Sequence, residues 1–444
     1  MNALRARLSS RNPLPGGALT VGVGLLLSGI CTYAFLAIAG HALTPLRYSA
    51  FAGFWALLFV VAPGIFLPLE QELGRAIAAR RAHGDGGGPV IWRCALIGGV
   101  FLLVLLAGSA LAFRGIDDHL LKGDGVLMVA LLLGLSAYCT QHLARGALSG
   151  NGRFRAYGTL IGAEGVYRVG LCALLAIAHV NTPGPYGVAL AAGSFAAVAT
   201  ALAGERALAR PGGPAHNSEV TVALGSLLVA SLATQFLFNG GTVMVQLLAS
   251  PSEQQAAGTF LNGRVLAFVP LFLFQAVAAA LLPRLSGLRS RGAIGDFRRT
   301  LARLLGFVTV LGALAIAGSF VLGPSVLKLV FGPNFDLSRA DLALLAASCT
   351  TLMAAQALGQ GLIASADYRG VVTGWLAGVV AFFVAVVLVR PLLLRVEMGI
   401  LAGGIVAAVT LALLQSALWR GDETGEPLPA AADVAALPSA GGFE

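Results

Sequence analysis

Residues 259–289 read TFLNGRVLAFVPLFLFQAVAAALLPRLSGLR, an apolar run that carries one arginine, contains Pro270 and Pro283, and ends among further arginines. At 1.5 Å per residue, Arg264 lies roughly 15 Å from a helix start near Gln254, about the middle of a bilayer. A cation at that depth costs on the order of 3 kcal/mol, so it usually faces a cavity or a partner. Two interpretations follow: an arginine satisfied by carbonyl groups or lipid headgroups, or a binding group for an anion.

The composition of the chain is that of a polytopic membrane protein. Of its 444 residues, 57% are hydrophobic and 11% are charged, with a mean hydropathy of +0.85. Soluble domains carry about 25% charged residues. The five cysteines lie in apolar segments without CxxC spacing, which favours neither a disulfide framework nor a zinc site. The net charge of +9 fits the cytoplasmic bias of arginine in membrane proteins, and we set nucleic acid aside as a partner.

Apolar runs of spanning length recur along the chain and predict twelve transmembrane helices. They lie at about 17–40, 50–69, 90–113, 125–147, 158–180, 185–205, 221–248, 254–282, 300–322, 338–364, 370–390 and 396–419. We expect an all-α polytopic membrane protein with two six-helix bundles.

The predicted domains follow from these runs. We expect a cytoplasmic N-terminal segment at 1–16, bundles at 17–205 and 221–420, a linker rich in Pro and Gly at 206–220, and a disordered cytoplasmic tail at 421–444. Of the 29 Lys and Arg residues, 20 fall in segments that share a side with the N-terminus, seven fall on the other side, and Arg168 and Arg264 fall inside helices. This asymmetry predicts a plasma-membrane protein with both termini in the cytoplasm.

The two halves resemble each other after their fourth helices. The sequence RGALSGNGRFRAYG at 145–158 has a counterpart in QGLIASADYRGVVTG at 360–374. Each half also has one helix with an internal proline, Pro63 and Pro270, and a second proline near its end. Paired Pro-interrupted helices in corresponding positions indicate a transporter with its site between the repeats. The alternative is chance recurrence of small residues in a Gly-rich membrane protein.

The chain resembles the polysaccharide (Wzx-type) flippases of the multidrug/oligosaccharidyl-lipid/polysaccharide exporter superfamily. The motifs that carry this resemblance are RGALSGNGRFRAY (145–157), NGRVLAFVPLFLFQAVAAALLPRLS (262–286), FGPNF (331–335) and QGLIASADYRG (360–370), and it covers about residues 17–420. It implies a V-shaped fold around a central cavity with alternating access, and a substrate class of undecaprenyl-pyrophosphate-linked sugars.

The resemblance also implies a role for Arg264, six residues ahead of Pro270, as the cavity arginine that holds the pyrophosphate. A guanidinium matches phosphate oxygens in paired hydrogen bonds and stays charged. Relatives that flip lipid II carry arginines in the first two helices as well. Here Arg11 and Arg47 lie at or beyond the ends of those helices, which favours another lipid-linked glycan.

Glu164 and Arg168 form the second intramembrane group, four residues apart and hence on one helical face. One interpretation is a self-neutralised pair. The other is a coupling or gating site, in which Glu164 takes a proton or Na⁺ and frees Arg168 for the phosphate. We expect Arg168 and Arg264 to line one central, water-accessible cleft. Glu70 and Glu72 precede three arginines at the end of the second helix, and they predict either an interfacial helix end or an inner gate.

The functional prediction is a transporter that moves a lipid-linked oligosaccharide, or a related anionic glycolipid, to the outer leaflet for cell-surface polysaccharide biosynthesis. The scattered histidines do not have the spacing of a metal site. The sequence contains neither the catalytic motifs we searched for nor an ATP-binding motif, so it indicates neither an enzyme nor a cofactor. Expected partners are the lipid-linked glycan, membrane lipids and other polysaccharide assembly proteins. The alternatives are a cation-coupled multidrug exporter of the same superfamily, and a scaffold or ligase of a polysaccharide assembly complex.

Overall fold

The structure of the chain, a computed structural model, describes residues 18–205, 208–216, 218–221 and 224–424. All regular secondary structure within these ranges is helical. The predicted N-terminal segment (1–16) lies outside the described residues, as do 425–444 of the predicted tail and 206–207 and 217 of the predicted linker.

Eleven helices of the described part are long and apolar enough to cross a membrane, or twelve if one bent pair counts as a span. The first half contains α2 (Ala18–Ala42), α3 (Pro45–Ala82), α4 (Gly88–Leu111), α6 (Gly125–Gly150), α7 (Phe154–Ile177) and α8 (Pro183–Leu202), with the short α5 (Phe113–Ile116) and η1 (Asp117–Leu121) between α4 and α6. The second half contains α10 (Leu224–Leu248), α11 (Ala256–Ala267), α12 (Val269–Ser290), α13 (Ile294–Phe331), α14 (Arg339–Ala364), α15 (Tyr368–Leu388) and α16 (Leu392–Thr424), with α9 (Ser218–Thr221) and η2 (Pro251–Glu253) as short turns.

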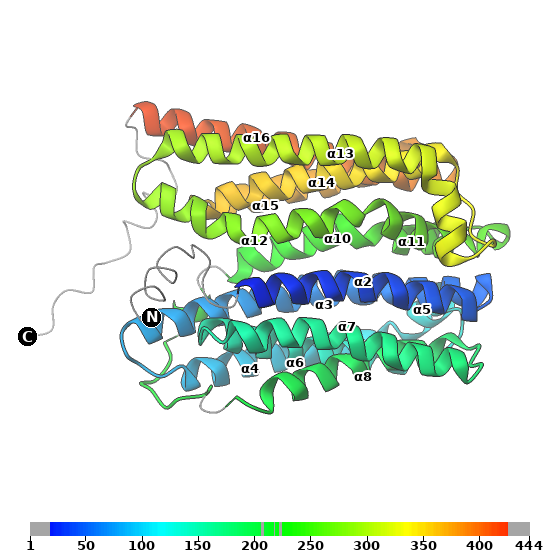
Figure 1. Ribbon diagram of the computed structural model, residues 1–444, viewed down its shortest axis with the longest axis horizontal. Coiled ribbons are helices and arrows are strands. Elements are labelled where there is room, and N and C mark those ends of the chain that lie inside the picture. The colour runs from blue at the N-terminus through cyan, green and yellow to red at the C-terminus, as the bar shows by residue number, and fades with distance from the viewer. Residues whose placement is uncertain (1–17, 206–207, 217, 222–223, 425–444) are drawn as a thin grey trace, which may run out of the picture.

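The two halves lie side by side with their helices roughly parallel to one long axis (Figure 1). Within the first half α2 packs on α7 and α3 on α6; within the second, α14 and α15 both pack on α16. The halves meet mainly where α10 and α11 pack against α3. The predicted all-α exporter architecture is confirmed, whereas the exact domain boundaries stay a prediction.

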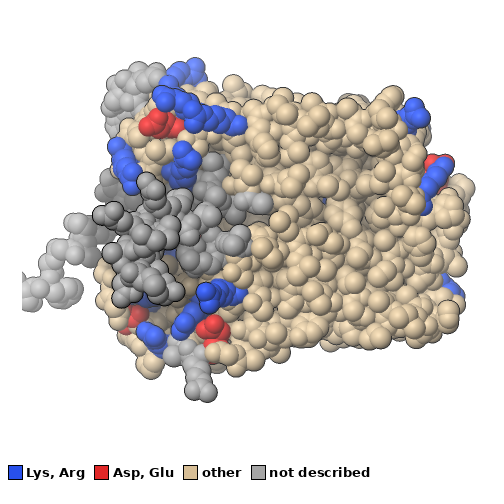
Figure 2. All heavy atoms as spheres, viewed as in Figure 1, with Lys and Arg blue, Asp and Glu red and all other residues tan. Residues whose placement is uncertain are grey.

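Charged side chains concentrate at the two ends of the helices. Figure 2 shows Lys and Arg gathered at one end of the visible face, and an uncharged band between the ends. We call this the basic end; α3 and α6 end there, and α4 and α7 begin there. An apolar band crossed by eleven or twelve spanning helices identifies a multi-pass membrane protein.

Helix α3 extends beyond the predicted apolar run at 50–69, since it begins at Pro45 and continues through Pro68 to Ala82. The added turns bury Leu69, Leu73 and Ile77 against α4 and α6. This packing compensates for the hydrogen bonds that the internal prolines cannot donate. As a consequence, the carboxyl group of Glu70 lies inside the helical bundle.

The stretch that carries Arg264 is two helices rather than the single predicted span at 254–282. Helices α11 and α12 meet at Phe268 with a bend of 44°. Pro270 lacks the N–H group that would continue the helical hydrogen bonding, which explains why the chain bends here. Arg264 therefore lies in the last turn of α11, beside the break.

Candidate functional site

A cavity of about 420 Å³ lies between the two halves. Helices α2, α3, α6 and α7 form one wall, and α10, α11 and α12 form the other. The ionisable residues that line it, apart from tyrosines, are His142, Arg145, Glu164, Arg168 and Arg264.

Arg264 is buried in the wall formed by the second half, with 5% of its surface exposed. Its Nη1 donates a hydrogen bond to the carbonyl oxygen of Phe238 at 2.6 Å, and its guanidinium lies 5.4 Å from the ring centroid of Phe268. Its Nε has no hydrogen-bond partner among the described residues, and none of their carboxylates forms an ion pair with it. Arg264 is thus a buried cation without an anionic partner.

Glu164 and Arg168 lie one turn apart on α7, in the opposite wall, and form an ion pair. Glu164 also accepts hydrogen bonds from Gln141 Nε2 at 2.6 Å and from Ser194 Oγ at 3.1 Å. Both carboxylate oxygens of Glu164 are therefore occupied. This arrangement favours the self-neutralised pair over a free coupling acid, although Arg168 does line the same cavity as Arg264.

Glu70 lies behind the wall of the first half and is bonded entirely within that half. Its Oε2 lies 2.7 Å from Nδ1 of His142 and 3.3 Å from Nε of Arg145, and its Oε1 accepts a hydrogen bond from the Tyr157 hydroxyl at 3.0 Å. The imidazole Nε2 has no partner among the described residues, although the ring lines the cavity. Glu70 thus positions two residues of the cavity wall.

Glu72 does not join this group. It is buried, and it pairs with Arg75 of its own helix at 2.6 Å, close to the basic end. Arg75 Nη2 also donates a hydrogen bond to the carbonyl oxygen of Glu219 in the linker. Of the two predictions made for Glu70 and Glu72, an interfacial helix end fits the geometry of Glu72 better than an inner gate does.

Reasoning from the sequence missed the polar side chains that α6 contributes to the cavity, which are Tyr138, Gln141, His142 and Arg145. Arg145 was counted among the basic residues on the N-terminal side of the membrane, but it lines the cavity and pairs with Glu70. The missed signal is the spacing of Tyr138, Gln141, His142 and Arg145, which repeats every three to four residues and places all four on one face of a helix.

The charges around the cavity do not cancel. Three guanidinium groups, on Arg145, Arg168 and Arg264, face two carboxylates, on Glu70 and Glu164, which leaves one positive charge in excess. The described residues include no group of three or more His, Cys, Asp or Glu side chains suited to a metal ion. The cavity is therefore suited to an anion rather than to a cation.

Comparison with solved structures gives the fold a context. An inward-facing multidrug resistance MATE family transporter of the MOP superfamily aligns with a TM-score of 0.73 at 12% identity, over 92% of this chain and 96% of that one. The chain has the MATE fold. The Vibrio cholerae MATE transporter VcmN, as a mutant, aligns with a TM-score of 0.66 at 16% identity, over 92% and 97% of the two chains. A MOP superfamily transporter from Pyrococcus furiosus, described with a binding pocket of reverse polarity, aligns with a TM-score of 0.65 at 12% identity, over 92% and 96%.

Sequence comparison adds relatives without a described activity. The uncharacterized protein Rv1510 of Mycobacterium tuberculosis is 28% identical over 442 residues, which cover 95% of this chain and 96% of that protein. The uncharacterized protein Rv3630 of the same organism is 27% identical over 400 residues, covering 88% and 90%. No family model matches the chain. The resemblance to the exporter superfamily is thus supported in the fold, and the polysaccharide-flippase subtype stays a proposal.

Proposed function

We propose that the protein is a membrane transporter that moves an anionic amphiphile from the inner to the outer leaflet by alternating access, with a lipid-linked oligosaccharide as the first candidate substrate. The observation that carries this proposal is Arg264, a cation with 5% exposure in the wall of a cavity between two helical halves. A buried charge without a partner is strongly unfavourable, so a site that retains one is suited to a ligand of opposite charge.

The two ends of the molecule differ in a way that alternating access requires. At the end opposite the basic end, the Tyr48 hydroxyl donates to Asn262 Oδ1 at 2.5 Å, and Ser49 Oγ donates to Gln246 Oε1 at 3.1 Å. All four side chains are buried, and each bond joins the first half to the second. The cavity reaches the other way, as far as Arg145 on α6. This state is closed at one end, and transport would require the Tyr48–Asn262 contact to open.

The size and chemistry of the cavity fit the headgroup of such a substrate. Its volume of about 420 Å³ falls within the range of small-molecule sites, about 300–1,000 Å³. It accommodates a phosphate and a sugar rather than a whole lipid, so the lipid tail would remain in the bilayer. The guanidinium of Arg264 would bind phosphate oxygens in paired hydrogen bonds.

A cation-coupled multidrug exporter is the second candidate, because multidrug MATE transporters share the fold. Such an exporter needs an acid that is free to bind a cation. In this cavity Glu164 is already engaged by Arg168, Gln141 and Ser194, and the surrounding charge is positive. A scaffold or ligase role has less support, because neither role explains the cavity or Arg264, which forms no ion pair among the described residues.

The leaflet distribution of lipid-linked glycans in cells depleted of the protein tests the proposal. We expect precursors to accumulate in the inner leaflet, wild type to relieve this, Arg264→Ala to fail and Arg264→Lys to rescue in part. Arg395→Gln is the control, because Arg395 is a half-buried arginine that also donates to a carbonyl, that of Leu248 at 3.4 Å, outside the cavity.

Two outcomes would contradict the proposal. An unchanged leaflet distribution on depletion would exclude transport of these lipids in favour of drug export or a scaffold role. Equal failure of Arg264→Ala and Arg395→Gln, with both proteins present in the membrane, would show that loss of stability rather than loss of anion binding explains the defect.

A further inference from the structure

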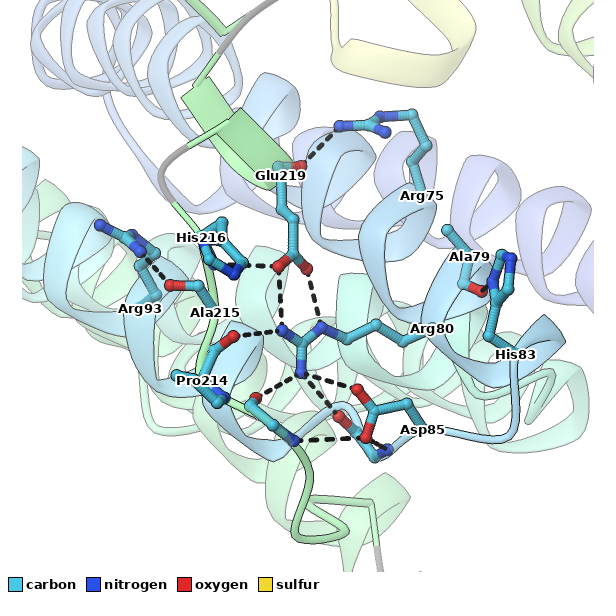
Figure 3. Close-up of polar contacts among 12 residues, drawn as sticks. Arg75, Ala79, Arg80, His83, Asp85, Arg93, Pro214, Ala215, His216 and Glu219 are labelled. Carbon is cyan, nitrogen blue, oxygen red and sulfur yellow. Dashed lines mark hydrogen bonds and ion pairs between the residues drawn. The ribbon is translucent and has the colours of Figure 1, made fainter. Parts of the chain in front are cut away.

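The described part of the linker between the two halves is held against the basic end of the first half. The guanidinium of Arg80, at the end of α3, forms two hydrogen bonds with the carboxylate of Glu219, at 2.7 and 2.9 Å. It also donates to the carbonyl oxygens of Gly213 at 2.8 Å and Pro214 at 2.9 Å (Figure 3). Arg80 is 9% exposed, so one buried side chain fixes the linker to α3.

The linker approaches the turn after α3 too closely for larger residues. A Cβ atom on Gly86 would lie 1.9 Å from the carbonyl oxygen of Pro211, and the N–H of Gly88 donates to the carbonyl oxygen of Arg210 at 2.8 Å. On the other side, Asn151 donates to the carbonyl oxygen of Leu208 at 3.3 Å. The glycines of this turn therefore permit a close backbone contact that defines where the linker lies.

This docking closes a pocket of about 240 Å³ between the turn after α3, the turn between α6 and α7, and the linker. Each segment contributes one arginine: Arg81, Arg153 and Arg210, which together define what we call the arginine pocket. Arg153 lies 3.3 Å from a carboxylate oxygen of Glu205. Among the described residues, no acidic side chain pairs with Arg81 or Arg210.

One acid lies in the wall of the arginine pocket, and its oxygens are already in use. Asp85 accepts hydrogen bonds from the N–H groups of Gly86 at 2.8 Å and Gly213 at 3.3 Å, and it lies 3.5 Å from Arg80. The positive charge of Arg81 and Arg210 is thus not cancelled inside the pocket. Two guanidinium groups that line one polar hollow match the charge of a phosphate group and can donate paired hydrogen bonds to its oxygens.

We propose that the arginine pocket binds a phosphate-bearing anion and that this ligand holds the linker docked. Arg210 belongs to the linker, whereas Arg81 and Arg153 belong to the first half, so a ligand that contacts all three favours the docked state over any state in which the linker has left. The phosphate could be that of an anionic lipid headgroup or of a soluble compound. The site is separate from the central cavity and does not depend on the transport proposal.

The test uses the purified full chain in an uncharged detergent, titrated with inorganic pyrophosphate. We expect a concentration-dependent rise in melting temperature and slower hydrogen exchange in residues 208–216. Arg81→Gln/Arg210→Gln should weaken the response at least about tenfold, because the variant loses the charge-assisted hydrogen bonds of two guanidinium groups. Arg303→Gln, an exposed arginine elsewhere at the basic end, should respond as wild type does.

Further arms separate the possible sources and sites. If the Arg264→Ala variant responds to pyrophosphate as wild type does, the binding lies outside the central cavity. If this variant does not respond, the proposal is wrong. Protection of 208–216 in nanodiscs with phosphatidylglycerol but not in phosphatidylcholine, without any effect of pyrophosphate, would assign the pocket to lipid. If neither ligand acts on wild type, or if the double variant responds as wild type does, the proposal is wrong. The single variant Arg210→Gln, on the exposed linker, replaces the double variant should that one fail to fold.

Discussion

The ion pair in the wall of the cavity allows a sharp test of whether its charges serve structure or substrate. Glu164 and Arg168 have side chains that are 8% and 4% exposed, so each would be a desolvated charge without the other. The perturbation is a set of three variants: Arg168→Met, Glu164→Gln, and the two combined.

The magnitude follows from what each change leaves behind. Removing one partner of a buried ion pair costs about 3–5 kcal/mol, because the remaining charge is buried and uncompensated. After Arg168→Met, Glu164 would still accept hydrogen bonds from Gln141 at 2.6 Å and Ser194 at 3.1 Å, so we expect the lower end, about 3 kcal/mol. The combined variant buries no charge, and we expect it to lie within about 1 kcal/mol of wild type.

The assay has two readouts, equilibrium unfolding in detergent and transport in reconstituted vesicles. A structural pair predicts that the combined variant recovers both the free energy of unfolding and transport. If Arg168 binds the substrate, the combined variant should recover stability without transport. Single variants that each lose less than about 1 kcal/mol, with no recovery in the combined variant, would refute the reasoning that these charges depend on each other.

Three further predictions concern other sites. Glu397 is fully buried, and neither of its carboxylate oxygens is hydrogen-bonded among the described residues. Glu397→Leu should therefore raise the free energy of unfolding, measured in detergent, by about 1–3 kcal/mol. A lower free energy of unfolding would show that the carboxylate has a partner. The hydrogen bond from Arg80 lowers the pKa of Glu219 to about 2 from its ordinary value of 4.5, so the docked linker should be stable above about pH 4.5 and released as the pH falls toward 2. Hydrogen exchange of residues 208–216 should show this release in wild type, and Glu219→Gln should show weak docking throughout the same range. Tyr48→Phe removes the hydrogen bond to Asn262 Oδ1. It should increase the labelling of a cysteine introduced into the cavity wall by impermeant reagents from the end opposite the basic end; equal labelling with Tyr48 retained would contradict a seal there.

Much of the architecture could be predicted because it depends on local composition. Apolar runs of about twenty residues specify spanning helices wherever they occur, and the structure places a helix at each of the twelve predicted positions. Helix ends were less predictable. The apolar run at 50–69 gives no sign of how far the second helix continues, whereas packing of Leu73 and Ile77 against α4 and α6 carries α3 to Ala82. Conversely, Pro270 marked a real break, although the hydropathy of the surrounding run is continuous.

The candidate site was only partly predictable, for a physical reason. Arg264 and the pair of Glu164 and Arg168 could be identified because a charge inside an apolar run is costly wherever it lies. His142 and Arg145 could not, since their importance comes from Glu70, more than seventy residues earlier in the chain.

The sequence alone indicates a helical membrane protein with arginines inside its apolar spans, because hydrophobicity and the cost of a buried charge act residue by residue. The exporter fold was an expectation from the family resemblance. The packed structure was needed to show that Arg168 has a carboxylate partner, whereas Arg264 forms no ion pair among the described residues. It was also needed to show that the linker and the first half together form the arginine pocket. Those properties depend on which side chains meet across helices, and long-range packing rather than local pattern sets those meetings.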